Sequence, residues 1–274
     1  NTGGSDTSDV SITVNDVAPS IAFTPSSRSV TKDVAVTSFS PVRTGGAVTG
    51  CTVNPALPTG LGVAVQSGEC VISGTATVLS EDQGYVFTAS NSGGTGQATL
   101  QLRVVDAVPV LSLSGSPFSW TLGSDIGSIT AGNTGGAVTG CSVTPALPQG
   151  ISLSSGCVLS GVPAALQAVS PYTITGTNTG GSGSVVASLE VKAVAPNLSF
   201  SPSTLVASKA VAIASQVPSN TGGALTGCTV SPALPAGLSL ETSTCGISGT
   251  PAVLVTTATD YTVTGTNTGG TSQA

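Results

Sequence analysis

Thr44-Gly-Gly-Ala-Val-Thr-Gly-Cys51, followed closely by Pro55-Ala-Leu-Pro-Thr-Gly-Leu61, is a sequence that this chain contains three times with few changes. The other two copies of the paired blocks occupy residues 134–141 with 145–151, and residues 221–228 with 232–238. The first cysteines of successive copies lie 90 and 87 residues apart. This period is too long for a solenoid unit and fits a small β-sandwich domain. The sequence therefore predicts three tandem domains of one kind.

Outward from these blocks, apolar residues alternate with polar ones in short runs. Tyr85, Phe87 and Ala89 form one such run, and residues 100–104 form another. Alternation with period two is typical of half-buried strands, and clusters of Gly, Pro, Asn and Ser separate the runs. No apolar stripe with helical period accompanies them. We expect an all-β chain of three Ig-like antiparallel β-sandwich repeats of about 88 residues, with boundaries at 20–108, 109–195 and 196–274.

Three motifs of the last repeat carry a resemblance to a known family. Residues 232–238, 247–251 and 261–270 resemble the bacterial Ig-like (cadherin-like) tandem repeat family of large surface and secreted proteins. The first repeat departs slightly, with Ala76 where the third has Pro251. The resemblance covers essentially the whole chain and implies the fold, whereas it says almost nothing about function.

The chain has six cysteines, two in each repeat. Six cysteines allow fifteen pairings, and the repeat symmetry selects one within each repeat. Buried thiols and metal ligation are the alternatives, and ligation is the weaker because no His or further Cys accompanies a pair. Persistent disulfides indicate an extracellular or cell-surface protein. The expected bridges are Cys51 with Cys70, Cys141 with Cys157, and Cys228 with Cys245.

The charge content is unusually low. Charged residues make up 7% of the chain and the net charge is −6, against about 25% charged residues in an average soluble domain. No basic stripe is present to neutralise phosphates, which argues against nucleic-acid binding. No apolar run is long enough for a membrane span. A surface of Ser, Thr and Gly suits self-assembly or glycan decoration, and residues 197–199 have the form of one glycosylation sequon.

The residue types that catalysis and metal binding require are scarce. The chain has no His, so no Ser or Cys has an imidazole base beside it, and we expect no enzyme and no cofactor. The adjacent Glu81 and Asp82 are interpreted as loop residues. Cadherin-like repeats often bind Ca²⁺ at their junctions, but the junctions here supply only Asp16, Asp106 and no third carboxylate. Trp120 is interpreted as a core or rim residue, and the Val-Ala-Pro junctions as stiff connectors.

Residues 1–19 are out of phase with the repeat that follows them. Val10, Ile12 and Val14 align with residues 100, 102 and 104 of the first repeat, so residues 5–17 are predicted to be the last strand of another sandwich. The third repeat, by the same alignment, lacks that strand. Either the sequence is a window on a longer repeat protein, or the strand of one copy completes the third repeat of the next.

These patterns favour a structural component of an extracellular bacterial filament or surface stalk, built from stacked repeats. Its expected partners are copies of itself, or neighbouring repeats of the same chain, joined head to tail. The alternative is an adhesin or phage-type fibre whose repeats bind a glycan or a receptor. The similar, short loops and the 3% content of aromatic residues give this alternative less support.

Overall fold

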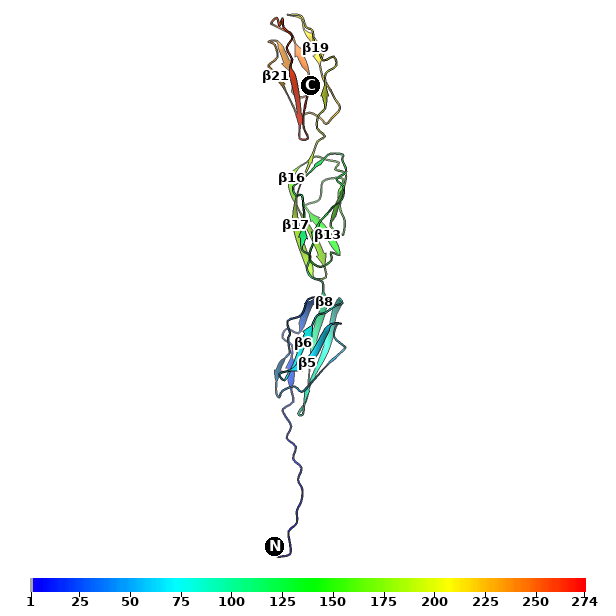
Figure 1. Cartoon of the computed structure of the whole chain (residues 1–274), viewed down its shortest axis with the longest axis vertical. Coiled ribbons are helices and arrows are strands. Elements are labelled where there is room, and N and C mark those ends of the chain that lie inside the picture. Colours follow the sequence, from blue (N-terminus) through cyan, green and yellow to red (C-terminus); the bar gives the residue numbers. More distant parts are fainter. Residues whose placement is uncertain (1) are drawn as a thin grey trace. The chain divides into compact units, whose positions relative to one another are not determined.

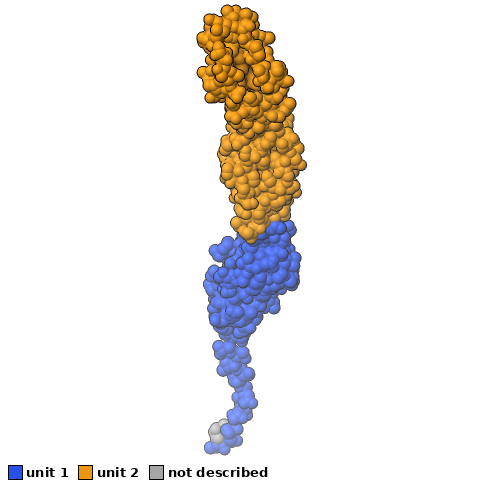
Figure 2. All heavy atoms as spheres, turned by 45° about the horizontal axis from the view of Figure 1, so that its top comes forward, with its two compact units in different colours: residues 1–109, 135–137, 177–182 blue, residues 110–134, 138–176, 183–274 orange. Residues whose placement is uncertain are grey.

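The structure is a computed structural model that describes residues 2–274, all of whose regular elements are β-strands (Figure 1). Asn1, the first residue of the predicted 1–19 segment, lies outside the described residues. The chain divides into two compact units (Figure 2): one holds residues up to 109 with 135–137 and 177–182, and the other holds the remainder. The predicted all-β class of three Ig-like sandwiches is confirmed. Residues 2–274 include no helix that could span a membrane.

Repeat 1 contains two facing sheets and a short pair of strands. The order of the larger sheet is β2-β8-β7-β4, the facing sheet is β5-β6, and β1 pairs with β3. The strands are β1 (Ser20–Ala22), β2 (Ser27–Thr31), β3 (Val42–Thr44), β4 (Gly50–Asn54), β5 (Leu61–Gln66), β6 (Glu69–Gly74), β7 (Ser80–Asn91) and β8 (Gly94–Val105).

Repeat 2 has the same plan. Its larger sheet has the order β10-β17-β16-β13, the facing sheet is β11-β15-β14, and β9 pairs with β12. The strands are β9 (Leu111–Ser112), β10 (Phe118–Thr121), β11 (Ile129–Thr130), β12 (Gly132–Asn133), β13 (Gly140–Thr144), β14 (Ile151–Leu153), β15 (Val158–Gly161), β16 (Gln167–Asn178) and β17 (Gly181–Lys192).

Repeat 3 has a smaller first sheet. Its order is β21-β24-β25, the facing sheet is β19-β23-β22, and β18 pairs with β20. The strands are β18 (Leu198–Ser199), β19 (Ile213–Gln216), β20 (Ser219–Asn220), β21 (Gly227–Ser231), β22 (Leu238–Leu240), β23 (Ile247–Gly249), β24 (Thr262–Asn267) and β25 (Gly270–Gln273).

Alternation along the long hairpin β7–β8 determines the core of repeat 1. Tyr85, Phe87 and Ala89 face inward on β7, and Leu100 and Leu102 do so on β8, all nearly inaccessible to solvent. Phe87 meets Phe23 edge to face, with ring centroids 5.0 Å apart. Because side chains of a strand point alternately to its two faces, this register places every second residue of 85–89 and of 100–104 in the core.

Each disulfide links the larger sheet of its repeat to the facing sheet or to the residues just before a strand of that sheet. Cys51 lies on β4 of the larger sheet and Cys70 on β6 of the facing sheet, with Cα atoms 5.8 Å apart. The equivalent Cα atoms in repeats 2 and 3 are 5.3 Å apart. The second cysteine of each pair is buried. Each bridge therefore crosses a hydrophobic core. The pairs are Cys51–Cys70, Cys141–Cys157 and Cys228–Cys245.

Two details differ from the sequence-based expectations. The pairing of β2 with β8 is parallel, as is that of β10 with β17, because the first strand of the larger sheet runs beside the last one. Glu81 and Asp82 do not form a loop. They lie in β7, in the irregular register between Ser80 and Gln83, where extra residues allow two polar side chains to remain exposed within a strand.

Candidate assembly strand and linker contacts

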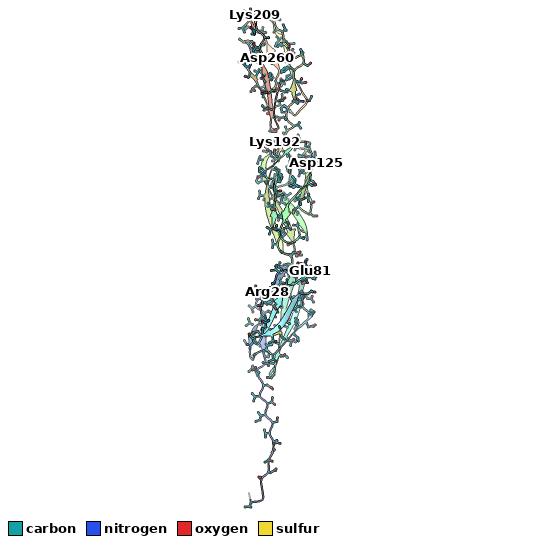
Figure 3. The ribbon with its side chains drawn as sticks, viewed as in Figure 1. Arg28, Glu81, Asp125, Lys192, Lys209 and Asp260 are labelled. Atoms are coloured by element: carbon teal, nitrogen blue, oxygen red, sulfur yellow. A yellow bond between two sulfur atoms is a disulfide. The ribbon has the colours of Figure 1, made fainter. Side chains whose placement is uncertain are left out.

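Ionisable side chains are dispersed over the described residues. Figure 3 labels six of them, and they come from all three repeats. The ion pair Arg43–Glu69, at 3.0 Å, joins residues of a single repeat. Within residues 2–274, no three His, Cys, Asp or Glu side chains lie together as metal ligands would. Three other features involve backbone groups and apolar side chains. The absence of a cofactor stays a prediction.

The first such surface is the segment 10–14, here called the assembly strand. The side chains of Val10, Ile12 and Val14 are 78%, 80% and 89% exposed, and the segment belongs to no strand. Their sequence counterparts on β8 are 1%, 0% and 2% exposed. The same pattern of apolar side chains is thus buried at the centre of one sandwich and fully accessible in this segment. The sequence-based assignment of a shared strand stays a prediction.

The second surface is the strand position in repeat 3 that corresponds to the outer half of β8. In repeat 1, β8 lies between β2, which pairs with Gln101–Val105 in parallel, and the first half of β7. The matching residues of repeat 3 are 204–208 and 256–260, and neither segment forms a strand. Val206 of the first segment is 90% exposed, and Val255, directly before the second segment, is 52% exposed. We call these two segments the open flanks of repeat 3.

The core of repeat 3 is correspondingly small. Its cluster of buried residues consists of Leu198, Cys228, Cys245 and Val263. The cluster of repeat 1 is larger and includes Leu100, Leu102 and Val104 of the outer half of β8. Tyr261 is partly exposed, although its counterparts Tyr85 and Tyr172 are each 3% exposed. Among the described residues, the buried cluster of repeat 3 is therefore smaller than that of repeat 1.

A third arrangement recurs at the junction before each repeat. In repeat 2 the hairpin tip between β16 and β17 contacts the preceding linker: Asn178 donates from Nδ2 to the Ala107 carbonyl at 2.7 Å, and the Thr179 hydroxyl accepts from the Asp106 amide at 2.9 Å. The carboxylate of Asp106 accepts from the same hydroxyl at 3.0 Å. The corresponding bonds of repeat 1 involve Asn91 with Val17 and Ser92 with Asp16, and those of repeat 3 involve Asn267 with Val194 and Thr268 with Ala193.

Sequence reasoning missed this arrangement. The sequence predicts stiff connectors at the Val-Ala-Pro segments, and nothing local to them indicates a contact with the Asn-x-Gly-Gly segments. A signal was nevertheless present, because the glycine that follows the Ser or Thr recurs at 93, 180 and 269. Its φ lies outside the left-handed region at all three positions, so the turn itself does not require glycine.

A family model identifies the type of domain. The family model described as Putative Ig domain matches residues 104–192 and 195–274. No curated protein matches. Among solved structures, the titin fragment I67–I69 is similar at 14% identity and a TM-score of 0.40, covering 96% of this chain and 97% of that one. The N-terminal eight Ig domains of Down syndrome cell adhesion molecule match at 16% identity and a TM-score of 0.36, covering 94% of this chain. This chain spans 36% of that longer structure.

Proposed function

Because the chain belongs to the Putative Ig domain family, we propose that it is a structural component of an extracellular filament or surface stalk built from stacked Ig-like repeats. Tandem sandwiches, each closed by its own disulfide, are suited to an oxidising environment and to resisting unfolding. The role is mechanical and requires neither catalysis nor a cofactor.

The observation that carries the proposal is the match between the assembly strand and the open flanks of repeat 3. The strand of one copy inserts between residues 204–208 and 256–260 of the next copy. The register of repeat 1 then places Ile12 beside Leu205 on one side and Thr259 on the other, because Leu102 pairs with Arg28 and Gln83. Val10 lies opposite Tyr261, as Leu100 lies opposite Tyr85. An inserted strand gains backbone hydrogen bonds along both edges and buries alternate side chains.

The free energies involved are small enough for a single substitution to decide whether two copies join. Burying one Val or Ile side chain contributes about 1.5–3 kcal/mol, and association itself costs about 4–15 kcal/mol in lost freedom of motion. Three such side chains and the strand hydrogen bonds therefore give a joint that depends on concentration. Joining a projecting strand at one end to an open sheet at the other is a heterologous contact that does not close, so it extends into a filament.

The test compares two neighbouring substitutions in the assembly strand. Ile12→Asp places a charge in the completed core, whereas Thr13→Asp places it on the outer face, as in the exposed counterpart Arg103. Sedimentation of the wild type should show species at multiples of 26.2 kDa. We expect Ile12→Asp to remain a monomer and Thr13→Asp to assemble. Wild-type monomers at every concentration, or equal loss of assembly in both variants, would refute the joint.

The alternative function is an adhesin or phage-type fibre that binds a glycan or a receptor. The observation in its favour is Arg28, whose guanidinium carbon lies 3.9 Å from the centre of the Phe39 ring, beside a small surface hollow that Phe23 also lines. A cation on an aromatic ring is a common element of recognition surfaces. Repeats 2 and 3 do not repeat it, since the residue equivalent to Arg28 is Phe118 in repeat 2 and Leu205 in repeat 3.

A further inference from the structure

We propose that the Asn-x-Gly tip of each long hairpin is a binding site for the backbone of the linker that precedes the repeat, and that this linker clamp makes the linker a fixed part of the repeat that follows it. The clamp consists of three residues, which are 91–93, 178–180 and 267–269 in the three repeats. Its ligand is an extended stretch of main chain, and its function is independent of any filament.

The asparagine of the clamp is held so that its amide must face the linker. In repeat 3 the Asn267 Oδ1 accepts from the Gly269 amide at 2.7 Å, which turns Nδ2 toward the linker. From there Nδ2 donates to the Val194 carbonyl at 2.7 Å and to the Ala224 carbonyl at 3.1 Å. One side chain thus ties together the hairpin tip, the linker and the Thr-Gly-Gly turn of the same repeat. An aspartate at this position would keep the Gly269 bond and lose both donors.

The hydrogen bonds that the clamp makes in all three repeats go to the main chain of the linker. The hydroxyl of Ser92, Thr179 or Thr268 accepts from a linker amide at 2.9–3.0 Å. A glycine amide of the Thr-Gly-Gly turn adds a bond to a linker carbonyl, from Gly46 at 3.0 Å and from Gly223 at 3.2 Å. This explains how one motif accommodates three linkers of different sequence, which are residues 16–18, 106–108 and 193–195.

The clamp glycine is required by the linker and not by the turn. A Cβ atom at Gly180 would lie 2.0 Å from the Asp106 carbonyl oxygen, and a Cβ at Gly93 or Gly269 would lie 1.9 or 2.0 Å from the carbonyl of Asp16 or Ala193. The φ angles permit an L-residue at all three positions. Any side chain here would therefore displace the linker while the hairpin could keep its conformation. The recurrence of glycine reports a close approach of two backbones.

One consequence concerns the assembly strand. At repeat 1 the clamp binds Asp16 and Val17 of the linker. The assembly strand ends two residues before Asp16. Clamping fixes the point and the direction from which that strand leaves repeat 1, without contacting Val10, Ile12 or Val14.

The test uses the amide of Asp106 in the full chain, whose hydrogen exchange reports the clamp of repeat 2. We expect Gly180→Ala to increase its exchange rate about tenfold, because at least one hydrogen bond is lost. Gly156→Ala is the matched control, since a Cβ there would have only the Ser154 hydroxyl within 4 Å, at 3.8 Å, and its φ is likewise ordinary. That control should leave the exchange rate unchanged.

A second variant keeps the test decisive if Gly180→Ala perturbs the hairpin. Thr179→Val retains the size and branching of the side chain and removes the acceptor of the Asp106 amide, so the same increase is expected. Unchanged exchange at Asp106 in both variants, with the β16–β17 amides still protected, would overturn the clamp. The experiment does not measure assembly, so its result does not depend on whether the proposed filament forms.

Discussion

At the scale of single residues, one cysteine pair cross-links each sandwich. Cys51 and Cys70 join β4 to β6 across a core that also holds Phe87 and Ile72, both 0% exposed. Linking two residues 19 positions apart removes about 3 kcal/mol of unfolded-chain freedom. The bridge is largely shielded, because Cys70 is 1% exposed. Reducing agents should therefore act slowly until the repeat opens.

Replacing Cys51 and Cys70 together by Ala should destabilise repeat 1 by about 3 kcal/mol. For a domain of this size, that corresponds to a decrease in Tm of roughly 12–24 °C. Calorimetry should resolve a lower transition for repeat 1 while the transitions of the other repeats stay in place. The matched control is the equivalent double replacement of Cys141 and Cys157, which should move a different transition. Peptide mapping that links Cys51 to a cysteine other than Cys70 would contradict this account.

At the scale of elements, the outer half of the last strand decides how complete a sandwich is. Repeats 1 and 2 place β8 and β17 between two neighbouring strands. In repeat 3 the open flanks have no strand pairing. Backbone amides without such pairing exchange with water quickly, whereas those in a central ladder exchange slowly.

In the Ile12→Asp monomer, equivalent segments of repeats 1 and 3 should therefore differ in their rates of hydrogen exchange. Residues 27–31 should be protected, and residues 204–208 should exchange at least about a hundredfold faster, near the rate of an open chain. In the assembled wild type, residues 204–208 and 256–260 should gain protection together. Protection of these open flanks in the monomer would show that the strand position is already filled.

Elements also show where sequence reasoning succeeds and fails. Alternating runs such as residues 85–89 predict strands and their inward faces, because a strand with one buried face has an apolar residue at every second position. The parallel pairing of β2 with β8 connects residues more than 70 positions apart, and no local pattern encodes it. Glu81 and Asp82 look like loop residues because two adjacent charges interrupt the alternation of apolar and polar residues. The irregular register at this point of β7 accommodates both within a strand. The contact of Gly180 with the Asp106 carbonyl is likewise non-local.

At the scale of the whole molecule, the proposed role follows from repetition of one unit. Each repeat has its own disulfide, its own hairpin and its own clamped linker, so extending the chain by further units requires no new device. Low charge, at 7% of residues, leaves little repulsion between copies. The boundaries at 20–108, 109–195 and 196–274 stay predictions. If the linker clamp holds, each linker (residues 16–18, 106–108 and 193–195) should unfold together with the repeat that follows it.

The most direct measurement of the central claim is the pairing of the assembly strand in the assembled state. Filaments grown from an equal mixture of ¹³C-labelled and ¹⁵N-labelled chains report only contacts between copies in a solid-state NMR transfer experiment. We expect contacts of residue 10 with residue 261 and of residue 12 with residues 205 and 259. Contacts of residues 10–14 with any other segment of the neighbouring copy, or no contact between copies at all, would contradict the shared strand.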